Sequence, residues 1–175
     1  MGNQACCSSS ALVAISDALT GAPLRQQFLP RPEYGARVSL AALPDSDGNG
    51  LPELAAVAPN EWGAAPGTRA LIYEGIPDAS QVLRPPKRSI AFTRGDTTDS
   101  PRPAVVVVPD VNGNAYPELA VLRSRVTPGR DEIQVTDAFT GHPSGNFGYD
   151  AQGLQFRAVA VIDDLDGSGS AAIAV

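Results

Sequence analysis

A stretch rich in oxygen-bearing side chains is the clearest chemical signal in the chain. It reads DSDGNGLPE, with side-chain oxygens at its first, third, fifth and ninth positions and a glycine at its sixth. Calcium prefers about six to eight oxygen ligands at roughly 2.3–2.6 Å, and alternate spacing supplies them when the backbone curls around the ion. We therefore expect a calcium site whose ligands are Asp45, Asp47, Asn49, the backbone carbonyl of Leu51, and Glu53.

The same pattern returns twice further along the chain. In the second copy, which starts at Val108, Asn replaces the middle Asp and Ala115 replaces the turn glycine. In the third copy, which starts at Ile162, Ala172 stands in place of the terminal Glu. The expected ligands of these loops are Asp110, Asn112, Asn114, the carbonyl of Tyr116, Glu118, Asp164, Asp166 and Ser168. A metal-free hairpin turn rich in Asx residues remains the alternative, and it gains weight from the first copy to the third.

An EF-hand is the competing interpretation of these loops, and three features argue against it. Its bidentate Glu belongs at the twelfth position, where Ala56 stands. Pro52 stands where its second helix would begin, and a β-like run follows. An acidic residue at the ninth position is optional in an EF-hand, yet Glu53 and Glu118 both occupy it. The loops are therefore expected between strands.

Short apolar runs on both sides of each loop predict those strands. Prolines are frequent and a helical period is absent, so the sequence predicts an all-β fold. The runs that flank the loops are 37–43, 53–58, 104–108, 118–123, 157–162 and 171–175. Further strands are expected at 11–17, 24–29, 69–74, 89–93 and 131–137.

Internal repetition sets the architecture that we expect. The phrase SDALTGAP at residues 16–23 returns as TDAFTGHP at residues 136–143, an offset of 120, and the acidic loops recur at offsets of 65 and then 54. These repeats indicate a unit of roughly sixty residues that cannot close a core alone, as in propeller blades or solenoid turns. We expect a partial β-propeller of about two and a half to three blades over residues 11–175, after a flexible tail of residues 1–10.

These motifs together resemble the FG-GAP repeat of integrin alpha-chain propellers and their bacterial relatives. The acidic loop lies between apolar strands, Asn146–Tyr149 is similar to the FG element with Tyr34–Gly35 as a weaker version, and Ala56–Pro59 is similar to the GAP element. The resemblance covers nearly the whole chain from Ala11 onward. It implies calcium loops that brace the blades, a protein or glycan ligand, and an extracellular, cell-surface or periplasmic location.

Charge and cysteine content exclude several classes of function. The 13 basic and 19 acidic residues give a net charge of −6, which argues against nucleic acid and anionic membranes as partners. The longest strongly apolar run, Ala104–Val108, is far shorter than a membrane span, and the N-terminus lacks the pattern of a secretory signal. Cys6 and Cys7 are adjacent, so they are expected to be free thiols in the tail, with a vicinal or intermolecular bridge as the alternatives.

The remaining candidate residues favour structural roles. His142 is the sole histidine and is expected in a solvated turn, without partners for a catalytic triad. The RGD tripeptide at 94–96 is expected in a mobile loop, with integrin-type adhesion as the alternative. The basic cluster at 84–88 is expected in a solvated edge segment, with a polyanion site as the alternative. Trp62 and Tyr73 are expected to pack between blades, with a ligand-binding face as the alternative.

We expect a non-catalytic recognition, adhesion or scaffolding module. A propeller enzyme with a hydrolase- or lyase-type site near the axis is the rival, and a structural surface-layer component is a third possibility. Because propellers typically have about four to eight blades, this chain is expected either to belong to a longer propeller or to form a six-bladed ring from two copies.

Overall fold

The structure is a computed structural model that describes residues 11–16, 18–29, 38–60, 67–75, 86–92, 104–127, 130–150, 158–168 and 170–175. Within these ranges all regular secondary structure is β-strand, which confirms the all-β prediction. No helix in this part of the chain could cross a membrane.

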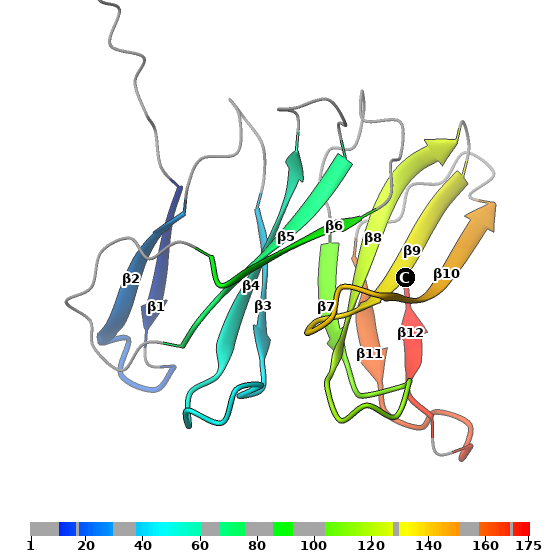
Figure 1. Ribbon diagram of the computed structural model, residues 1–175. Coiled ribbons are helices and arrows are strands. Elements are labelled where there is room, and N and C mark those ends of the chain that lie inside the picture. The colour runs from blue at the N-terminus through cyan, green and yellow to red at the C-terminus, as the bar shows by residue number, and fades with distance from the viewer. Residues whose placement is uncertain are drawn as a thin grey trace, which may run out of the picture.

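The described strands form four antiparallel sheets (Figure 1). Two sheets are complete meanders of four strands, ordered β3-β4-β5-β6 and β7-β8-β9-β10, and the other two, β1-β2 and β11-β12, are single hairpins. The strands are β1 (Ala11–Ser16), β2 (Pro23–Leu29), β3 (Ser39–Leu43), β4 (Glu53–Asn60), β5 (Gly67–Tyr73), β6 (Arg88–Phe92), β7 (Ala104–Val108), β8 (Glu118–Thr127), β9 (Arg130–Asp137), β10 (Pro143–Asp150), β11 (Ala160–Ile162) and β12 (Ala172–Ala174).

The sheets pack face to face, and small or β-branched side chains fill the space between them. One core cluster joins Ala55, Val57 and Ile72 of the β3–β6 sheet to Leu119 and Val121 of the next sheet. A second cluster joins β7, β8 and β9 to β11 and β12, and a third joins β1 to β4 and β5. Strands β4 and β8 are apolar on both faces because each is covered from both sides.

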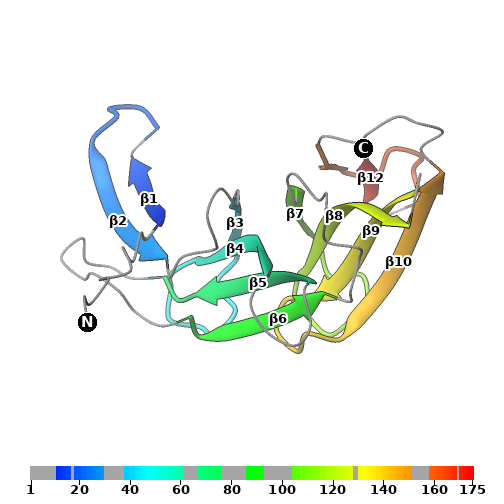
Figure 2. The same ribbon diagram turned by 90° about the horizontal axis from the view of Figure 1, so that it is seen from above.

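The first strands of successive sheets lie side by side. Strand β3 contacts β7, and β7 contacts β11. Seen from above in Figure 2, the sheets follow an arc, with β3 and β7 on its concave side and β6 and β10 toward its convex side. No sheet closes onto another in the described ranges, and the two hairpin sheets lie at opposite ends of the stack (Figure 1).

Every predicted strand is present, although several ends differ. Val38, Ala158, Val159, Ala171 and Val175 were expected within strands but lie outside them. Glu74 likewise follows β5, and β8 continues past its predicted end at Arg123, to Thr127. The predicted tail with its two cysteines, and Arg37, Arg157, Asp17, Thr93 and the pair 34–35, lie outside the described residues.

Strand β10 is the element whose bounds the sequence did not predict. It pairs with β9 along its length and carries the Asn146–Tyr149 segment. Pro143, Gly145 and Gly148 interrupt any period-two pattern and look like turn residues, so only the tertiary pairing makes this segment a strand.

Candidate metal centre

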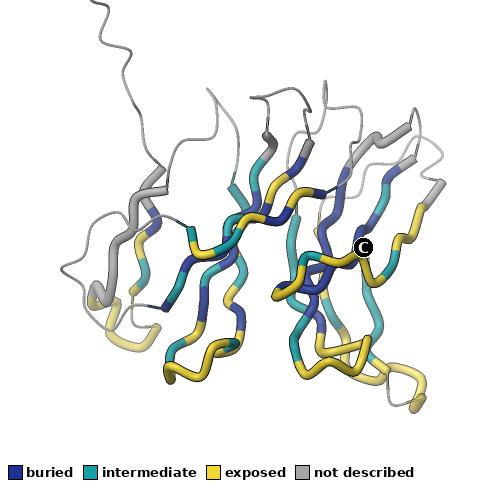
Figure 3. Tube along the Cα trace, in the orientation of Figure 1, coloured by how far each residue is buried: buried dark blue, intermediate teal, exposed yellow. Residues whose placement is uncertain are grey.

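All three acidic stretches are hairpin loops at the same end of the stack. They connect β3 to β4, β7 to β8 and β11 to β12, the first and second strands of their sheets. Figure 3 shows these loops as mostly exposed, whereas the buried residues lie in the strands. The prediction that strands rather than helices flank the loops is therefore confirmed.

The first loop is organised around the carboxylate of Asp45. Its Oδ1 accepts hydrogen bonds from the backbone N–H groups of Asp47 at 3.2 Å, Gly48 at 2.8 Å and Asn49 at 3.1 Å. Its Oδ2 accepts one from the N–H of Gly50 at 2.6 Å. Gly48 and Gly50 adopt φ of 77° and 83°, a conformation that glycine enters without a Cβ penalty. The backbone therefore curls around the Asp45 carboxylate, whereas the predicted curl around a calcium ion stays a prediction.

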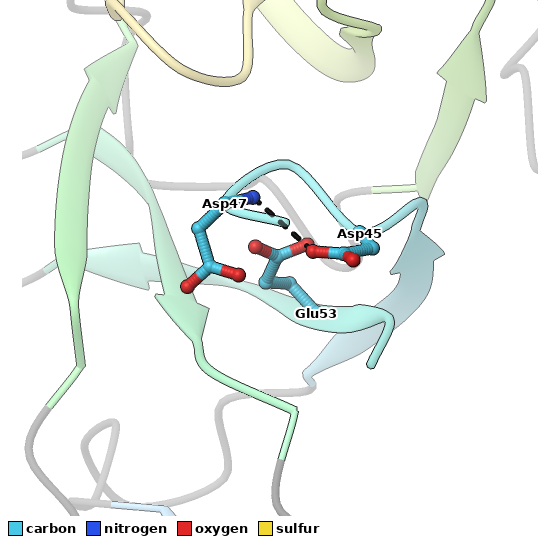
Figure 4. A group of neighbouring side chains, drawn as sticks. All are labelled: Asp45, Asp47 and Glu53. Carbon is cyan, nitrogen blue, oxygen red and sulfur yellow. Dashed lines mark hydrogen bonds between the residues drawn. The ribbon is translucent and has the colours of Figure 1, made fainter. Parts of the chain in front are cut away.

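Three carboxylates converge at this loop. One oxygen each of Asp45, Asp47 and Glu53 lies within 4.8 Å of the other two (Figure 4). Glu53 is only 1% exposed and accepts hydrogen bonds from the backbone N–H of Ser46 at 3.0 Å and from its hydroxyl at 2.7 Å. The loop thus places two exposed carboxylates above one that is buried and fixed.

This cluster fits a calcium ion. Two oxygens bound to one calcium at roughly 2.3–2.6 Å can be at most about 5 Å apart, and the three carboxylates meet that limit. Asn49, another expected ligand, is adjacent, but both atoms of its side-chain amide already have partners. Its Oδ1 accepts the N–H of Leu51 at 2.8 Å, and its Nδ2 donates to Glu74.

A lysine competes for the same carboxylates. The ammonium group of Lys87 pairs with Asp47 Oδ2, and its hydrogen bond lowers the pKa of Asp47. The loop therefore already attracts a cation from its own chain, and a calcium ion would have to compete with Lys87 for Asp47.

The second loop repeats the hydrogen bonds of the first. Asp110 Oδ1 accepts the N–H groups of Asn112 at 3.2 Å, Gly113 at 2.7 Å and Asn114 at 3.2 Å, and its Oδ2 accepts that of Ala115 at 2.6 Å. Burial would raise the pKa of Asp110, but these four N–H groups outweigh it and lower the pKa. The first and second loops, which belong to different sheets, thus have the same backbone hydrogen-bond pattern.

Glu118 lies at the base of the second loop, as Glu53 does in the first. It is fully buried and accepts the N–H of Val111 at 3.0 Å and the hydroxyl of Ser144 at 3.4 Å. Burial and the nearby charges of Asp110 and Asp137 raise its pKa. A buried carboxylate beside two others is the setting in which a bound cation relieves the most repulsion.

Asp137 is a member of this site that sequence reasoning missed. It ends β9 and accepts hydrogen bonds from the side-chain amides of Asn112 and Asn114. Its Oδ1 also accepts from Phe139 N at 2.9 Å and from the Thr140 hydroxyl at 2.8 Å. Burial opposes ionisation, yet these hydrogen bonds prevail and lower the pKa of Asp137 to about 2.

Glu74 has the corresponding place in the first complete sheet. It directly follows β5, the third strand, and Asn49 Nδ2 donates to its Oε1 at 3.3 Å. Asp137 is the Asp of the repeated D-A-x-T-G phrase, and this phrase was the signal that the sequence offered. An Asx residue that caps a turn lies where a strand ends.

The third loop departs from this design. Gly167 adopts φ of 73°, like Gly48 and Gly113, but Asp164 itself adopts a positive φ of 37°. Ser168 donates its backbone N–H to Asp166 Oδ1 at 3.1 Å, and Ala172 of β12 replaces the buried Glu. This loop therefore lacks the buried carboxylate that lies at the base of the other two.

An acidic cleft of about 340 Å³ separates the second and third loops. Its lining includes three carboxylates, and no sequence pattern indicated it because they come from two loops that are distant along the chain. The lining residues are Pro109, Asp110, Val111, Asp163, Asp164, Ser170 and Ala171.

Arg88 joins the first loop to the second complete sheet. Its guanidinium donates to the Ser46 hydroxyl at 3.0 Å and to the Ala138 carbonyl at 3.3 Å. It also lies over the Phe139 ring at 4.4 Å, and that ring stacks on Tyr116 of the second loop at 4.2 Å. The prediction that this basic segment is a solvated edge is wrong for Arg88, because the next sheet supplies partners that the local sequence does not show.

The other candidates have the structural surroundings that were expected or lie outside the described residues. His142 is exposed in the turn before β10, where its N–H donates to the Thr140 hydroxyl at 3.2 Å. Tyr73 is 1% exposed within a core cluster, and burial raises its pKa to about 12. Trp62, the RGD tripeptide at 94–96 and the start of the basic cluster at 84–85 are outside the described residues.

Comparison with family models, with curated proteins and with solved structures finds no match to this chain.

Proposed function

We propose that this chain is a calcium-binding, non-catalytic module built from propeller-type blades of the FG-GAP kind, which recognises a protein or glycan. The observation that carries the proposal is the recurrence of one acidic hairpin, with the same carboxylate-centred hydrogen bonds and a buried Glu at its base, at the same end of two adjacent sheets.

The arrangement of the sheets supports the propeller part of the proposal. A propeller places four-stranded meanders face to face around a central channel. Here the meanders pack face to face, and their first strands β3 and β7 lie against each other, with β11 next to β7.

The electrostatics of the loops support the calcium part. Five carboxylates belong to the first two loops, and the base carboxylates Glu53 and Glu118 are buried beside exposed ones. Because buried like charges repel strongly, a divalent cation with oxygen ligands is the natural counter-charge. In this role calcium stiffens the loops and supplies no chemistry for catalysis.

The exposed side chains support the recognition part. Several large apolar side chains are exposed in loops and turns, among them Leu19 between β1 and β2, Val111 in the second acidic loop and Leu165 in the third, which are 96%, 55% and 70% exposed. Exposed apolar groups beside ordered acidic loops suit a macromolecular partner. The proposal implies that the protein is located outside the cytosol, because calcium is abundant there and not in the cytosol.

Isothermal titration with calcium tests the proposal directly. The unsubstituted chain should bind calcium, and Glu53→Gln should abolish binding at the first loop because it removes a ligand charge while keeping the side chain's shape. The matched control is Asp166→Ala in the third loop, which lacks the buried Glu and should leave binding at the first loop intact. Absence of measurable heat at millimolar calcium would refute the calcium part of the proposal.

A further inference from the structure

A cation from the chain itself lies at the first acidic loop. The ammonium group of Lys87 pairs with Asp47 Oδ2, and Asp47 is one of the three carboxylates that converge there with Asp45 and Glu53 (Figure 4). Both side chains of the ion pair are partly exposed, so an ion from solvent can reach the carboxylate without unfolding the loop. Because like charges repel, that ion and the ammonium group compete for Asp47.

Strand pairing places Lys87 beside this loop. Its N–H donates to the carbonyl of Ile72 in β5 at 2.7 Å, and the next residue, Arg88, begins β6 opposite Ile72. Arg88 in turn donates to the Ser46 hydroxyl of the loop at 3.0 Å. The pairing of β5 with β6 therefore holds the backbone of Lys87 within reach of the loop, and only the side chain has to move when the ion pair breaks.

The second loop has neutral residues at both corresponding places. Asn112 stands where the first loop has Asp47, and its amide donates to the hydroxyl of Ser144, near the start of β10, at 3.4 Å. The first loop thus has three carboxylates and one ammonium group, whereas the second has two carboxylates of its own. Lys87 therefore offsets the additional charge of Asp47, and both loops have the same formal charge.

We infer that Lys87 is a built-in competitor of calcium at the first loop, where calcium binding displaces its ammonium group from Asp47. This inference rests on the calcium binding proposed above. Without calcium, the ammonium group relieves the repulsion among the three carboxylates. Calcium has twice the charge and takes several oxygen ligands, so it can replace the ammonium group. The first loop therefore exchanges one cation for another, whereas the second loop takes up calcium without such an exchange.

Calcium titration of Lys87→Met measures this competition. In a Glu118→Gln background, which removes the contribution of the second loop, Lys87→Met should tighten calcium binding at the first loop about two- to fivefold, the range that exposed ion pairs contribute. Lys87→Arg keeps a cation beside Asp47 and should leave the affinity close to that of the background. Arg69→Met removes one positive charge from an exposed position on the same sheet and should have little effect.

The same substitutions in a Glu53→Gln background give the matched comparison. The second loop is intact there, and Lys87→Met should change its calcium binding no more than Arg69→Met does. Equal tightening in both backgrounds, or equal tightening by Arg69→Met, would indicate a general charge effect and would overturn the inference. Calcium binding at the first loop that Lys87→Met leaves unchanged would overturn the inference alone. Absence of calcium binding in the unsubstituted chain and in every variant would overturn it together with the proposed function.

Discussion

At the scale of single residues, the chemistry of the loops depends on carboxylates that folding removes from water. Glu53 and Glu118 are held at the start of β4 and β8, below the exposed Asp residues of their loops. Each accepts hydrogen bonds from its own loop in the absence of an ion. The proposed ion binding would therefore need little rearrangement of the backbone.

Glu118→Gln should have opposite effects without and with calcium. Because the folded state raises the pKa of Glu118, its protonated form favours folding below the ordinary carboxyl pKa, and this contribution is lost as the pH rises through the raised value. At neutral pH the neutral amide should therefore raise the melting midpoint in chelator. In millimolar calcium it should remove the second loop's share of the calcium shift. The exposed His142→Ala should change neither midpoint, and a Glu118→Gln variant that behaves like it would refute this role for Glu118.

Asp137 should make the stability of the fold depend on pH in the opposite sense to Glu118. Its pKa is lowered from 3.8 to about 2, so its contribution is present above the ordinary value and is lost as the pH falls toward 2. Asp137→Ala should lower the free energy of unfolding at neutral pH by about 1–3 kcal/mol, since it removes the acceptor of the Asn114 amide and of the Thr140 hydroxyl and one of the two acceptors of the Asn112 amide. Urea unfolding between pH 2 and 7 measures both effects. A variant as acid-sensitive as the unsubstituted chain would contradict this assignment.

At the scale of elements, the two complete loops offer a reciprocal test of backbone strain. Gly50 and Ala115 occupy the same loop position with φ of 83° and 69°, a region that costs a non-glycine residue about 1 kcal/mol. Ala115→Gly should therefore raise the free energy of unfolding by up to about 1 kcal/mol, and Gly50→Ala should lower it by a similar amount. Denaturant midpoints of the two single variants check this, and a change of the same sign in both would contradict it.

Arg88 should couple the two complete sheets. Arg88→Met removes two hydrogen bonds and the contact with the Phe139 ring, so the free energy of unfolding should fall by about 1–3 kcal/mol. Arg88→Lys should recover little of that loss, because an ammonium group lacks the planar fork that reaches both partners. Arg69→Met, at an exposed position on β5, is the control and should be nearly neutral. A Lys variant as stable as the unsubstituted chain would show that charge alone matters at this position.

Strands and loops could be predicted from the sequence to the extent that their signal is local. Alternation of oxygen-bearing side chains and the glycine at position 50 predict a curled loop between strands, and the loop that is observed curls around Asp45. The roles of Asp137 and Arg88 could not be predicted in this way. Their partners are distant along the chain and become neighbours only when strands pair and sheets stack. The bounds of strand β10 were missed for another reason, because Pro143, Gly145 and Gly148 hide its strand pattern.

At the scale of the whole molecule, the repeats predict the stacked sheets but not the contacts between them. The offsets of 65 and 54 between loops indicated repeated sheets, and the two four-stranded meanders agree with that. The contacts between successive sheets depend on side chains that no local pattern brings together.

The melting midpoint in chelator and in millimolar calcium is the most direct test of calcium binding by these hairpins. A ligand that binds only the folded state stabilises it by about 2.7 kcal/mol at a hundredfold excess over Kd, so calcium should raise the midpoint clearly. Asp47→Ala should remove most of the rise, because it takes an oxygen from the cluster of Asp45, Asp47 and Glu53. An unchanged midpoint for the unsubstituted chain in calcium would contradict calcium binding.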